Sequence, residues 1–450
     1  MQPSRPGTGV VAGAAPGVSG AADTAAARDR EPRVAGDAAG ISAQLPPLAL
    51  YVHFPWCVRK CPYCDFNSYT LHGELPQEAY LAALERDLAA QAAGMEQSAQ
   101  AVGMEQAAQA AQRPLISIFL GGGTPSLFAP EAIGRVLAAA RAAFGFAPGI
   151  EITLEANPGT IERGRFAEYA AAGVNRVSLG AQSFGERQLA ALGRIHSGAE
   201  TVRAAEELHA AGLHNFNLDL MYALPGQDTA GALSDLRQAL ALSPAHISHY
   251  QLTLEPGTPF AAKPPPLPPE EECAAMLEAC EADLAAAGFD HYEVSAWALP
   301  GRRSRHNLNY WTFGDYIGAG AGAHGKLSGP DGIVRTRHIR DPRRYQAGVP
   351  GTTTPVAARD LPFEFMMNAL RLPEGFEEAL YRLRTGLDWA TAHDRMADLV
   401  RRGLVSGEAG RWRPTPTGLR YLNDVLVSFL PQTVSPITQA AKSLSSPLGV

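Results

Sequence analysis

The sequence has few cysteines, no long apolar run and no excess of positive charge. Five Cys among 450 residues are too few for the disulfide framework that stabilises small secreted domains. No stretch approaches the roughly 20 consecutive apolar residues that cross a bilayer, so we expect no transmembrane segment. The net charge is −7, from 38 Lys and Arg against 45 Asp and Glu. This balance argues against a dedicated nucleic-acid-binding protein.

The remaining composition is that of an ordinary globular protein. Hydrophobic residues make up 46% of the chain and charged residues 18%, and a chain of this length usually forms two or three domains. Three of the five cysteines lie between positions 57 and 64, which indicates metal chemistry in a reducing compartment. We therefore expect a cytoplasmic protein.

Three segments contain too few large hydrophobic residues to form a packed core. Residues 1–44 are rich in Ala, Gly and Pro and contain no aromatic residue, so we expect a disordered tail. They also lack the continuous apolar stretch of a signal peptide. We interpret 94–112, which contains a near-repeat of nine residues, as a low-complexity insertion. The Ser- and Pro-rich end, 433–450, is expected to be a second disordered tail.

Between these segments, short apolar runs alternate with stretches of helical periodicity. Strand–helix alternation predicts a parallel sheet covered by helices, and six consecutive units favour an α/β fold of the partial (β/α)6 barrel type. We place the barrel core at 45–265 and an extension of it at 266–350. The predicted strands are Leu48–Phe54, Leu115–Leu120, Ile150–Leu154, Asn175–Leu179, Asn215–Met221 and His246–Leu252.

The pattern changes in 351–432. Helical segments near 363–371, 376–384 and 391–402 precede a predicted hairpin near 407–413, which is typical of a small winged-helix-like α+β domain. Residues 360–430 carry 9 basic and 10 acidic side chains, so binding to a phosphate backbone has little electrostatic support. We interpret this domain as a structural appendage.

The strongest chemical signal is a cysteine motif directly after the first predicted strand. Cys57, Cys61 and Cys64 have the spacing C-x3-C-x2-C. Three thiolates on one loop can bind three irons of a cubane cluster and leave the fourth iron open to a substrate. Zinc would require a fourth Cys or His, and Asp65 and Phe66 supply no soft ligand. The alternatives are three structural thiols or an incomplete zinc site.

This motif, at the end of the first strand of a predicted barrel, resembles that of the radical S-adenosylmethionine (SAM) superfamily. The resemblance extends over roughly 45–430 of the chain. It implies a [4Fe-4S] cluster whose open iron binds the amino and carboxylate groups of SAM. One electron from the cluster then cleaves SAM to methionine and a 5′-deoxyadenosyl radical, while the protein positions the cofactors and excludes water.

The resemblance also implies SAM contacts at successive strand ends. Three glycines after the second strand allow a close approach of backbone to ligand, and their amides can hold a carboxylate. Taken alone, each position fits a turn or an ordinary hydrogen bond at the barrel rim. The implied SAM-binding residues are Tyr51, Gly122, Gly123, Thr124, Glu155, Gln182, Arg194 and Asp219.

Within the superfamily, the sequence is most similar to the oxygen-independent coproporphyrinogen III oxidase group, which also includes a branch of heme chaperones. The oxidases carry a further cysteine at the position of Phe66. In addition, residues 305–311 fit the H-N-x-x-Y-W pattern of the chaperone branch. These two features favour a heme chaperone that delivers heme to hemoproteins such as respiratory-chain enzymes. The alternative is a coproporphyrinogen III oxidase, whose activity the absent cysteine puts in doubt.

His306 is the predicted heme contact in this motif. A neutral imidazole is a good ligand for heme iron, and Tyr310 and Trp311 offer flat apolar surface. The alternative is a buried histidine beside a core aromatic pair, and His324 is a weaker candidate for the heme contact. The expected partners are heme, recipient hemoproteins and an electron donor for the cluster. An RNA-modifying radical enzyme is a third alternative, which the absence of a basic surface disfavours.

For the two remaining cysteines, the sequence predicts a role in core packing rather than in metal binding. Cys273 and Cys280 are seven residues apart on one predicted helix, so they share a face with Met276. We expect that face to point into the core.

Overall fold

The computed structural model describes residues 45–100, 113–159 and 164–430. Both expected tails and most of the expected insertion at 94–112 lie outside the described residues. The described chain divides into two compact units. The first unit contains residues 45–310 and 314–354, and the second contains 311–313 and 355–430.

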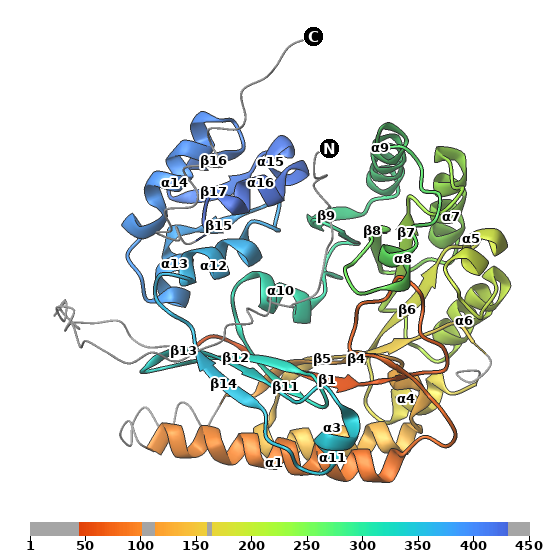
Figure 1. Cartoon of the computed structure of the whole chain (residues 1–450), viewed down its shortest axis with the longest axis horizontal. Helices are drawn as coiled ribbons and strands as arrows, with labels where there is room; N and C mark the ends of the chain where they lie inside the picture. Colours follow the sequence, from red (N-terminus) through yellow and green to blue (C-terminus); the bar gives the residue numbers. More distant parts are fainter. Residues whose placement is uncertain (1–44, 101–112, 160–163, 431–450) are drawn as a thin grey trace. The chain divides into compact units, whose positions relative to one another are not determined.

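The first unit is organised around one twisted sheet (Figure 1), which has twelve strands among the described residues. Seven adjacent strands in its centre run parallel to one another. In spatial order these are β11 (Asp315–Ala319), β1 (Leu48–Phe54), β4 (Leu115–Gly122), β5 (Phe146–Ala156), β6 (Arg176–Gln182), β7 (Phe216–Tyr222) and β8 (His246–Gln251).

All six predicted strands are present, so the partial-barrel prediction is confirmed. The seventh parallel strand, β11, was missed. It pairs with β1 so that Gly318 lies beside Tyr51. Its five residues include a Gly and an Ala, which are weak strand signals, and β11 follows the short helix α10 (Arg305–Trp311) rather than a regular βα unit.

Further strands extend both edges of the parallel core. β10 runs antiparallel to β8 and to β9, whereas β12 runs antiparallel to β11 and to β13. The added strands are β9 (Asp290–Glu293), β10 (Ala296–Ala298), β12 (His324–Gly329), β13 (Gly332–Arg337) and β14 (Thr352–Pro355).

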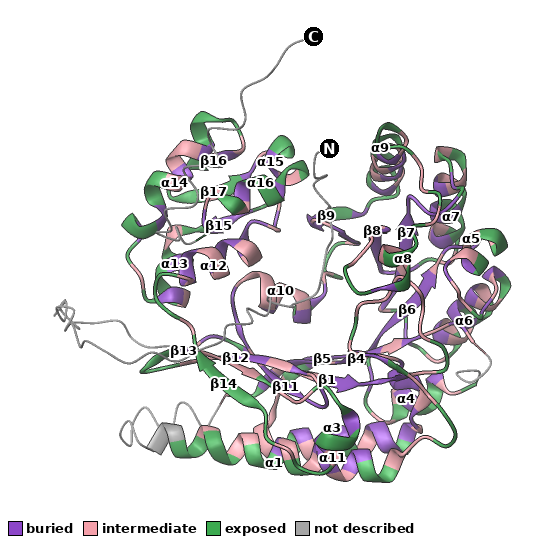
Figure 2. Cartoon of the chain, in the orientation of Figure 1, coloured by how far each residue is buried: buried purple, intermediate pink, exposed green. Residues whose placement is uncertain are grey.

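Helices cover the outer face of the parallel strands, as Figures 1 and 2 show. Alternate strand residues such as Leu50 and Val52 are fully buried against these helices, as expected for a strand with side chains on two faces. Ser197 and Glu200 form a capping box that fixes the start of α6. The described helices of the first unit, apart from α10, are α1 (Gln77–Gln100), α3 (Pro130–Phe144), α4 (Phe166–Ala171), α5 (Glu186–Ala191), α6 (Gly198–Ala210), α7 (Thr229–Ala241), α8 (Pro259–Ala262), α9 (Glu270–Ala286) and α11 (Pro342–Gln346), and α8 lies at the carboxyl ends of the strands rather than on the outer face.

The face of α9 that carries Cys273, Met276 and Cys280 is buried in the hydrophobic core. The expectation of a packing role for these two cysteines is confirmed.

The inner face of the parallel strands is polar. The Asn217 carboxamide on β7 donates to Ser178 on β6 at 2.8 Å and accepts from Ser248 on β8 at 3.0 Å. His246 on β8 bonds Asn217 at 2.6 Å and Tyr292 at 2.7 Å. Buried polar groups of this kind are tolerated because each has a partner. The inside of the barrel is therefore a hydrogen-bonded network rather than a packed apolar core.

The second unit combines helices with a small antiparallel sheet in the order β15-β17-β16. Its core is aromatic, because the Phe365 ring lies within 5.7 Å of Phe313, 5.0 Å of Phe376 and 5.1 Å of Tyr381. The predicted helices and hairpin are present. The elements are α12 (Leu361–Ala369), β15 (Phe376–Glu377), α13 (Glu378–Thr385), α14 (Ala390–Arg401), β16 (Val405–Glu408), β17 (Arg411–Pro414), α15 (Pro416–Arg420) and α16 (Leu422–Val427).

Within the part of the chain that the structure describes, every helix is too short or too polar to span a bilayer.

Candidate cluster and SAM site

The three clustered cysteines lie on one loop, residues 57–70, which we call the cysteine loop. Two short strands close it: β2 (Trp56–Cys57) pairs in parallel with β3 (Tyr69–Thr70). Inside the loop, the Lys60 ammonium donates to the carbonyl oxygens of Phe66 at 2.9 Å and Ser68 at 3.0 Å. These contacts hold the loop in one shape at the carboxyl end of β1.

The three thiols are half-buried and close enough to influence one another. Burial raises the pKa of the Cys57 thiol to about 11, and the charges of Cys64 and Cys61 raise it further, whereas a hydrogen bond with Thr124 lowers it. Metal binding would deprotonate these thiols, because the thiolate is the form that ligates a metal cation.

The number of available ligands bears on which metal group the loop can hold. Among the described residues, no three His, Cys, Asp or Glu side chains converge closely enough to hold a single metal ion. A zinc site needs four ligands around one point. In an iron–sulfur cubane each thiolate binds a different iron, so the three sulfurs need not converge. The loop offers three cysteines, and Asp65 and Phe66 directly after them supply no fourth soft ligand, so its residues fit a cluster better than zinc.

The glycine loop after β4 packs directly against the chain that leads into the cysteine loop. The Gly123 amide donates to the carbonyl oxygen of Phe54 and the Thr124 amide to that of Trp56, both at 2.7 Å. A Cβ on Gly123 would lie 2.6 Å from the Trp56 carbonyl oxygen, and one on Gly122, whose φ is +108°, would lie 2.3 Å from the His53 ring. Larger residues would displace the backbone that precedes Cys57.

These amides were expected to hold a ligand carboxylate. In the structure all three have acceptors within the chain, because Gly122 donates to the Glu155 carboxylate at 3.0 Å. The glycines thus have a demonstrated packing role, and the contact of Gly122, Gly123 and Thr124 with SAM stays a prediction.

Two carboxylates face the barrel interior near this loop. Burial raises the pKa of Glu155 to about 8, the nearby Asp219 raises it further and the Gly122 hydrogen bond lowers it. Burial also raises the pKa of Asp219, against hydrogen bonds from Asn217, Ser178 and Tyr250 that lower it. Such a pair is suited to bind a cationic group such as a ligand ammonium.

Tyr51 lies beside these carboxylates on β1. Its ring stacks on Phe119 with centroids 6.4 Å apart, and its hydroxyl donates to Nδ1 of His53 at 2.9 Å. Burial raises the pKa of Tyr51 well above its ordinary value, and the charge of Glu155 adds to the shift. Tyr51 is therefore a neutral phenol at ordinary pH.

Arg194 connects the cysteine loop to the ends of β5 and β6. Its guanidinium donates to Cys61 Sγ at 3.7 Å, to Asn157 Oδ1 at 2.5 Å and to the Gly180 carbonyl oxygen at 2.7 Å. Gln182, at the end of β6, has a φ of +65°, which only a minority of non-glycine residues adopt. Both residues lie at the carboxyl-end rim of the barrel, and their contact with SAM stays a prediction.

Three residues in this region were not predicted. Asn157 bridges Arg194 and Thr124, to which its amide donates at 3.0 Å. Ser68 lies 3.7 Å from Cys64 Sγ through its hydroxyl. Asn67 fastens the cysteine loop to a distant segment of the chain through the carbonyl oxygens of Ala321 and Arg340. Only Asn157 had a sequence signal, because it follows Glu155 by two residues at a strand end.

The predicted heme contact lies elsewhere in the first unit, in the interior of the barrel. His306 on α10 is 1% exposed. Its Nδ1 is 3.0 Å from Ser117 Oγ, its Nε2 is 2.9 Å from the Tyr310 hydroxyl, and its ring lies against Phe119 at 5.2 Å. Burial lowers the pKa of His306 to about 3, and the charge of Arg176 adds to the shift. His306 is thus a neutral imidazole with both nitrogens engaged.

The other residues of the H-N-x-x-Y-W motif have different surroundings. Tyr310 packs edge-on against Tyr316 with centroids 4.5 Å apart. Trp311 belongs to the second unit, where the Arg371 guanidinium lies 4.3 Å over its ring. His324, the weaker candidate, is half-buried at the start of β12.

Comparisons with known families agree with the division into two units. Residues 51–237 match the model of the radical SAM superfamily. Residues 356–421 match the model of the HemN C-terminal domain.

Curated relatives match nearly their whole length. The chain is 46% identical over 389 residues to "Heme chaperone HemW" of Escherichia coli, a match that covers 86% of this chain and 99% of the relative. It is 36% identical over 397 residues to "Heme chaperone HemW" of Mycobacterium tuberculosis strain H37Rv, covering 85% and 95%. It is 34% identical to the bovine "Radical S-adenosyl methionine domain-containing protein 1, mitochondrial", covering 88% and 91%.

One solved structure shares the fold over most of the chain. Coproporphyrinogen III oxidase (HemN) from Escherichia coli, described as a radical SAM enzyme, superimposes with a TM-score of 0.70 at 21% identity, covering 86% of this chain and 90% of that one.

Proposed function

Because the chain belongs to the HemW family of radical SAM proteins, we propose that it is a heme chaperone, which binds heme and delivers it to hemoproteins. The observation that carries this proposal is the 46% identity to a protein named as a heme chaperone, over 99% of that protein's length. Membership in the superfamily also implies a [4Fe-4S] cluster and SAM.

We propose that Cys57, Cys61 and Cys64 hold the cluster. When bound, a cluster of this kind supplies an electron to SAM. The chain's own contribution is positional: Lys60 and the β2–β3 pair fix the loop, and Arg194 donates to the Cys61 sulfur. Hydrogen bonds to cluster sulfurs tune their reduction potential.

The rim residues supply complementary charges for SAM. Glu155 and Asp219 suit its ammonium group, and Arg194 suits its carboxylate. We propose that Tyr51, Gln182 and the Gly122–Thr124 loop complete this site, since Tyr51 lies on β1, the strand that leads into the cysteine loop, the glycine loop follows β4 and Gln182 ends β6.

Phe66 is a residue that distinguishes this chain from the porphyrin oxidases of the related group. It is 46% exposed on the cysteine loop, at the position where the oxidases of the related group carry a further cysteine. A phenyl ring cannot ligate a metal or exchange a proton. The resemblance to the solved oxidase therefore supports the fold and not its reaction.

His306 stays a predicted heme contact, but one of its hydrogen-bond partners must move before the imidazole can bind iron. Coordination of iron through Nε2 would require the Tyr310 hydroxyl to move away, and coordination through Nδ1 would require Ser117 to do so. Since the imidazole is already neutral, no deprotonation is needed.

Heme titration of anaerobically reconstituted protein tests the proposal. We expect about four irons per chain before heme is added, and a Soret band from bound heme afterwards. His306→Ala should weaken heme binding and leave the cluster in place, whereas Cys64→Ala should remove the cluster. His393→Ala, a change to an exposed histidine on α14, is the matched control.

Two results would contradict the proposal. One is the absence of heme binding by the cluster-loaded protein. The other is formation of protoporphyrinogen from coproporphyrinogen III in an anaerobic assay with SAM and a reductant, which would assign the chain to the oxidases.

A further inference from the structure

Two histidines far from the cysteine loop have ring nitrogens that face each other. His209 lies in the last turn of α6, and His214 lies in the short segment that leads into β7. Their Nδ1 atoms are 3.1 Å apart, and their ring centroids are 5.4 Å apart. We call them the histidine pair. Two imidazole nitrogens at this distance can share either a proton or a metal ion.

The histidine pair lies at the opposite edge of the parallel strands from the cysteine loop. His214 comes two residues before the start of β7, whereas the cysteine loop follows the carboxyl end of β1. The strands from β1 to β7 run in the same direction, so the start of one strand and the end of another lie at different edges. Figure 1 labels α6 and β7. The pair is therefore separate from the candidate cluster and SAM site.

The surrounding structure holds the His209 ring in the form that a metal ion requires. Its Nε2 lies 3.0 Å from the carbonyl oxygen of Leu242. A carbonyl oxygen can only accept a hydrogen bond, so Nε2 carries the proton, and Nδ1 of the neutral ring keeps a free electron pair. Phe216 packs edge-on against the same ring, with centroids 5.1 Å apart. Metal-bound histidines commonly donate their other ring N–H to a backbone carbonyl in this way.

His214 supplies the second nitrogen. It is exposed, whereas His209 is half-buried. Because His209 Nδ1 accepts, His214 Nδ1 donates the proton that joins the two rings. A metal ion takes the place of this proton when His214 carries its proton on Nε2 instead, which is a change between two neutral tautomers.

The separation of the two nitrogens fits a single metal ion. With metal–nitrogen distances of about 2.0–2.1 Å, two ligand nitrogens lie about 2.9 Å apart at a right angle and about 3.3 Å apart at the tetrahedral angle. The observed 3.1 Å falls between these values. Imidazole suits Zn²⁺, Ni²⁺ and Cu²⁺, whereas Mg²⁺ prefers oxygen ligands. Among the described residues, no third His, Cys, Asp or Glu completes the group, so water must supply the remaining ligands.

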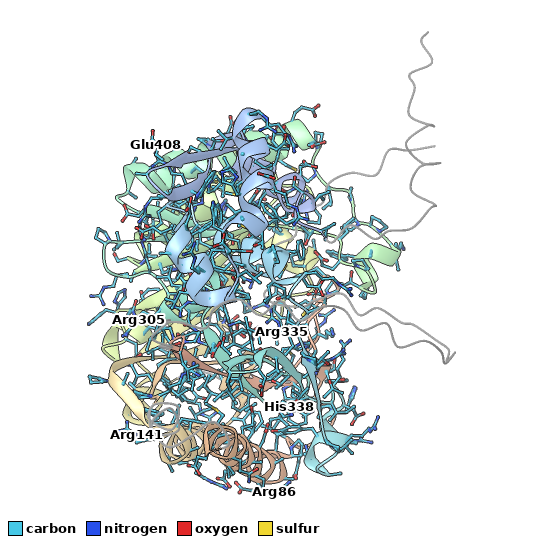
Figure 3. The ribbon with its side chains drawn as sticks, turned by 90° about the vertical axis from the view of Figure 1, so that its left-hand side faces the viewer. Arg86, Arg141, Arg305, Arg335, His338 and Glu408 are labelled. Carbon is cyan, nitrogen blue, oxygen red and sulfur yellow. The ribbon has the colours of Figure 1, made fainter. Side chains whose placement is uncertain are left out.

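A histidine elsewhere in the first unit shows the contrast. His338, which Figure 3 labels, has its Nε2 3.0 Å from the Gly318 carbonyl oxygen and 3.4 Å from the Asp87 carboxylate. Both neighbours are acceptors, so this nitrogen carries a proton and is not available to a metal ion. In the histidine pair, by contrast, the only group beside each Nδ1 that an interaction identifies is the other imidazole.

We propose that the histidine pair binds one divalent ion of the late first transition series, with Nδ1 of each ring as a ligand. The ion joins the end of α6 to the segment before β7. Because it binds the folded pair more tightly than the separated rings of the unfolded chain, it stabilises the first unit. This site does not depend on the proposed function, since neither histidine belongs to the candidate cluster, SAM or heme residues.

Calorimetric titration of the untagged, cluster-loaded chain with Ni²⁺ under anaerobic conditions tests the site. We expect Ni²⁺ to bind and to raise the melting temperature, whereas Mg²⁺ should do neither. His209→Gln and His214→Gln should each weaken Ni²⁺ binding by at least about tenfold, which is the effect that loss of even an outer-shell partner has. The side-chain amide of the first variant can still donate to the Leu242 carbonyl oxygen, so the local fold is kept. Any Ni²⁺ held by thiols would be retained in both variants, so the difference between the proteins reports the pair alone.

The matched control is His393→Gln. His393 is an exposed histidine on α14 with the Asp394 carboxylate 3.1 Å away, and its loss should leave Ni²⁺ binding unchanged. Equal Ni²⁺ affinity in the unchanged protein and both pair variants would overturn the proposal. An equal loss of affinity in the His393 variant would also overturn it, because any exposed histidine would then account for the binding.

Discussion

Glu155 and Gly122 are joined by a hydrogen bond of 3.0 Å from the Gly122 amide to the Glu155 carboxylate. The bond connects the carboxyl ends of β4 and β5. The glycine loop after β4 in turn contacts the residues that precede Cys57. The bond partly offsets the burial and the repulsion from Asp219 that raise the pKa of Glu155 to about 8. The end of the glycine loop is therefore held by a group that titrates near neutral pH.

This arrangement predicts a pH-dependent stability. The pKa of Glu155 is 4.5 in its ordinary state and about 8 in the fold, so between these values the folded chain binds a proton that the unfolded chain has released. The contribution of this residue to the free energy of unfolding therefore falls as the pH rises through that range. Urea unfolding without SAM, from about pH 5 to about pH 9, should show a shallower decline for Glu155→Gln than for the unchanged protein. Parallel curves would contradict the assignment.

Gly123→Ala should destabilise the first unit. The added Cβ would lie 2.6 Å from the Trp56 carbonyl oxygen and 2.7 Å from that of Phe54, so backbone beside the cysteine loop must move. We expect a loss of about 1–3 kcal/mol in unfolding free energy and reduced iron retention. Gly94→Ala is the control: no atom lies within 4 Å of its added Cβ on helix α1, and alanine is the better helix former by about 1 kcal/mol. Equal stabilities of the two variants would refute the packing argument.

Substitutions of Cys64 and Cys280 should have different effects, because the first is a proposed cluster ligand and the second lies in the core. Cys64→Ser should abolish stable cluster assembly, because it removes one of three ligands, and iron and sulfide analysis after anaerobic reconstitution measures the loss. Cys280→Ser should keep the cluster and instead lower the melting temperature, since it places a hydroxyl in the apolar core between α9 and the sheet. Retention of a full cluster by the Cys64 variant would remove the basis of the proposed function.

A buried ion pair at the edge of β11 predicts a large stability effect. Asp315 accepts from Lys326 and Arg113, each at 2.8 Å. Burial alone would raise the pKa of Asp315, but these two cations hold it below its ordinary value. Asp315→Asn leaves two cations without a counter-charge, and we expect a loss of about 3–5 kcal/mol in chemical unfolding.

The surface pair Arg411–Glu377, 2.7 Å apart and about half exposed, provides the comparison. Glu377→Gln should cost less than about 1 kcal/mol. A similar cost for both substitutions would show that the Asp315 cluster is screened by solvent.

The sequence predicted the parts of the fold that have a strong local pattern. The apolar runs that became β1, β4, β5, β6, β7 and β8 lie between clear helical stretches, and each prediction was confirmed to within a few residues. The strands β9 to β14 were missed because they are short, and because β12 and β13 carry polar and charged residues. Their positions depend on pairing with a sheet already formed, which local periodicity does not encode.

The candidate site, like the fold, was predictable only where the sequence carries a local pattern. The spacing of the three cysteines and the polar residues at strand ends identified the rim of the barrel. The contact of His306 with Tyr310, four residues later, lies within the motif that the sequence had already singled out. Its second partner, Ser117, was not predictable, because it lies 189 residues earlier on β4 and was an ordinary residue in the sequence. Asn67 was missed for a similar reason: its partner Arg340 lies 273 residues further along the chain.

That separation has a consequence for biosynthesis. On a ribosome, the chain emerges from its N-terminal end, so the cysteines are made early and Arg340 late. The bonds between Asn67 and Arg340 cannot form until almost the entire first unit has been synthesised. A nascent chain halted before that point would carry its thiols on a loop that still lacks this anchor, so we expect the final shape of the proposed cluster site to form only at a late stage of the protein's maturation.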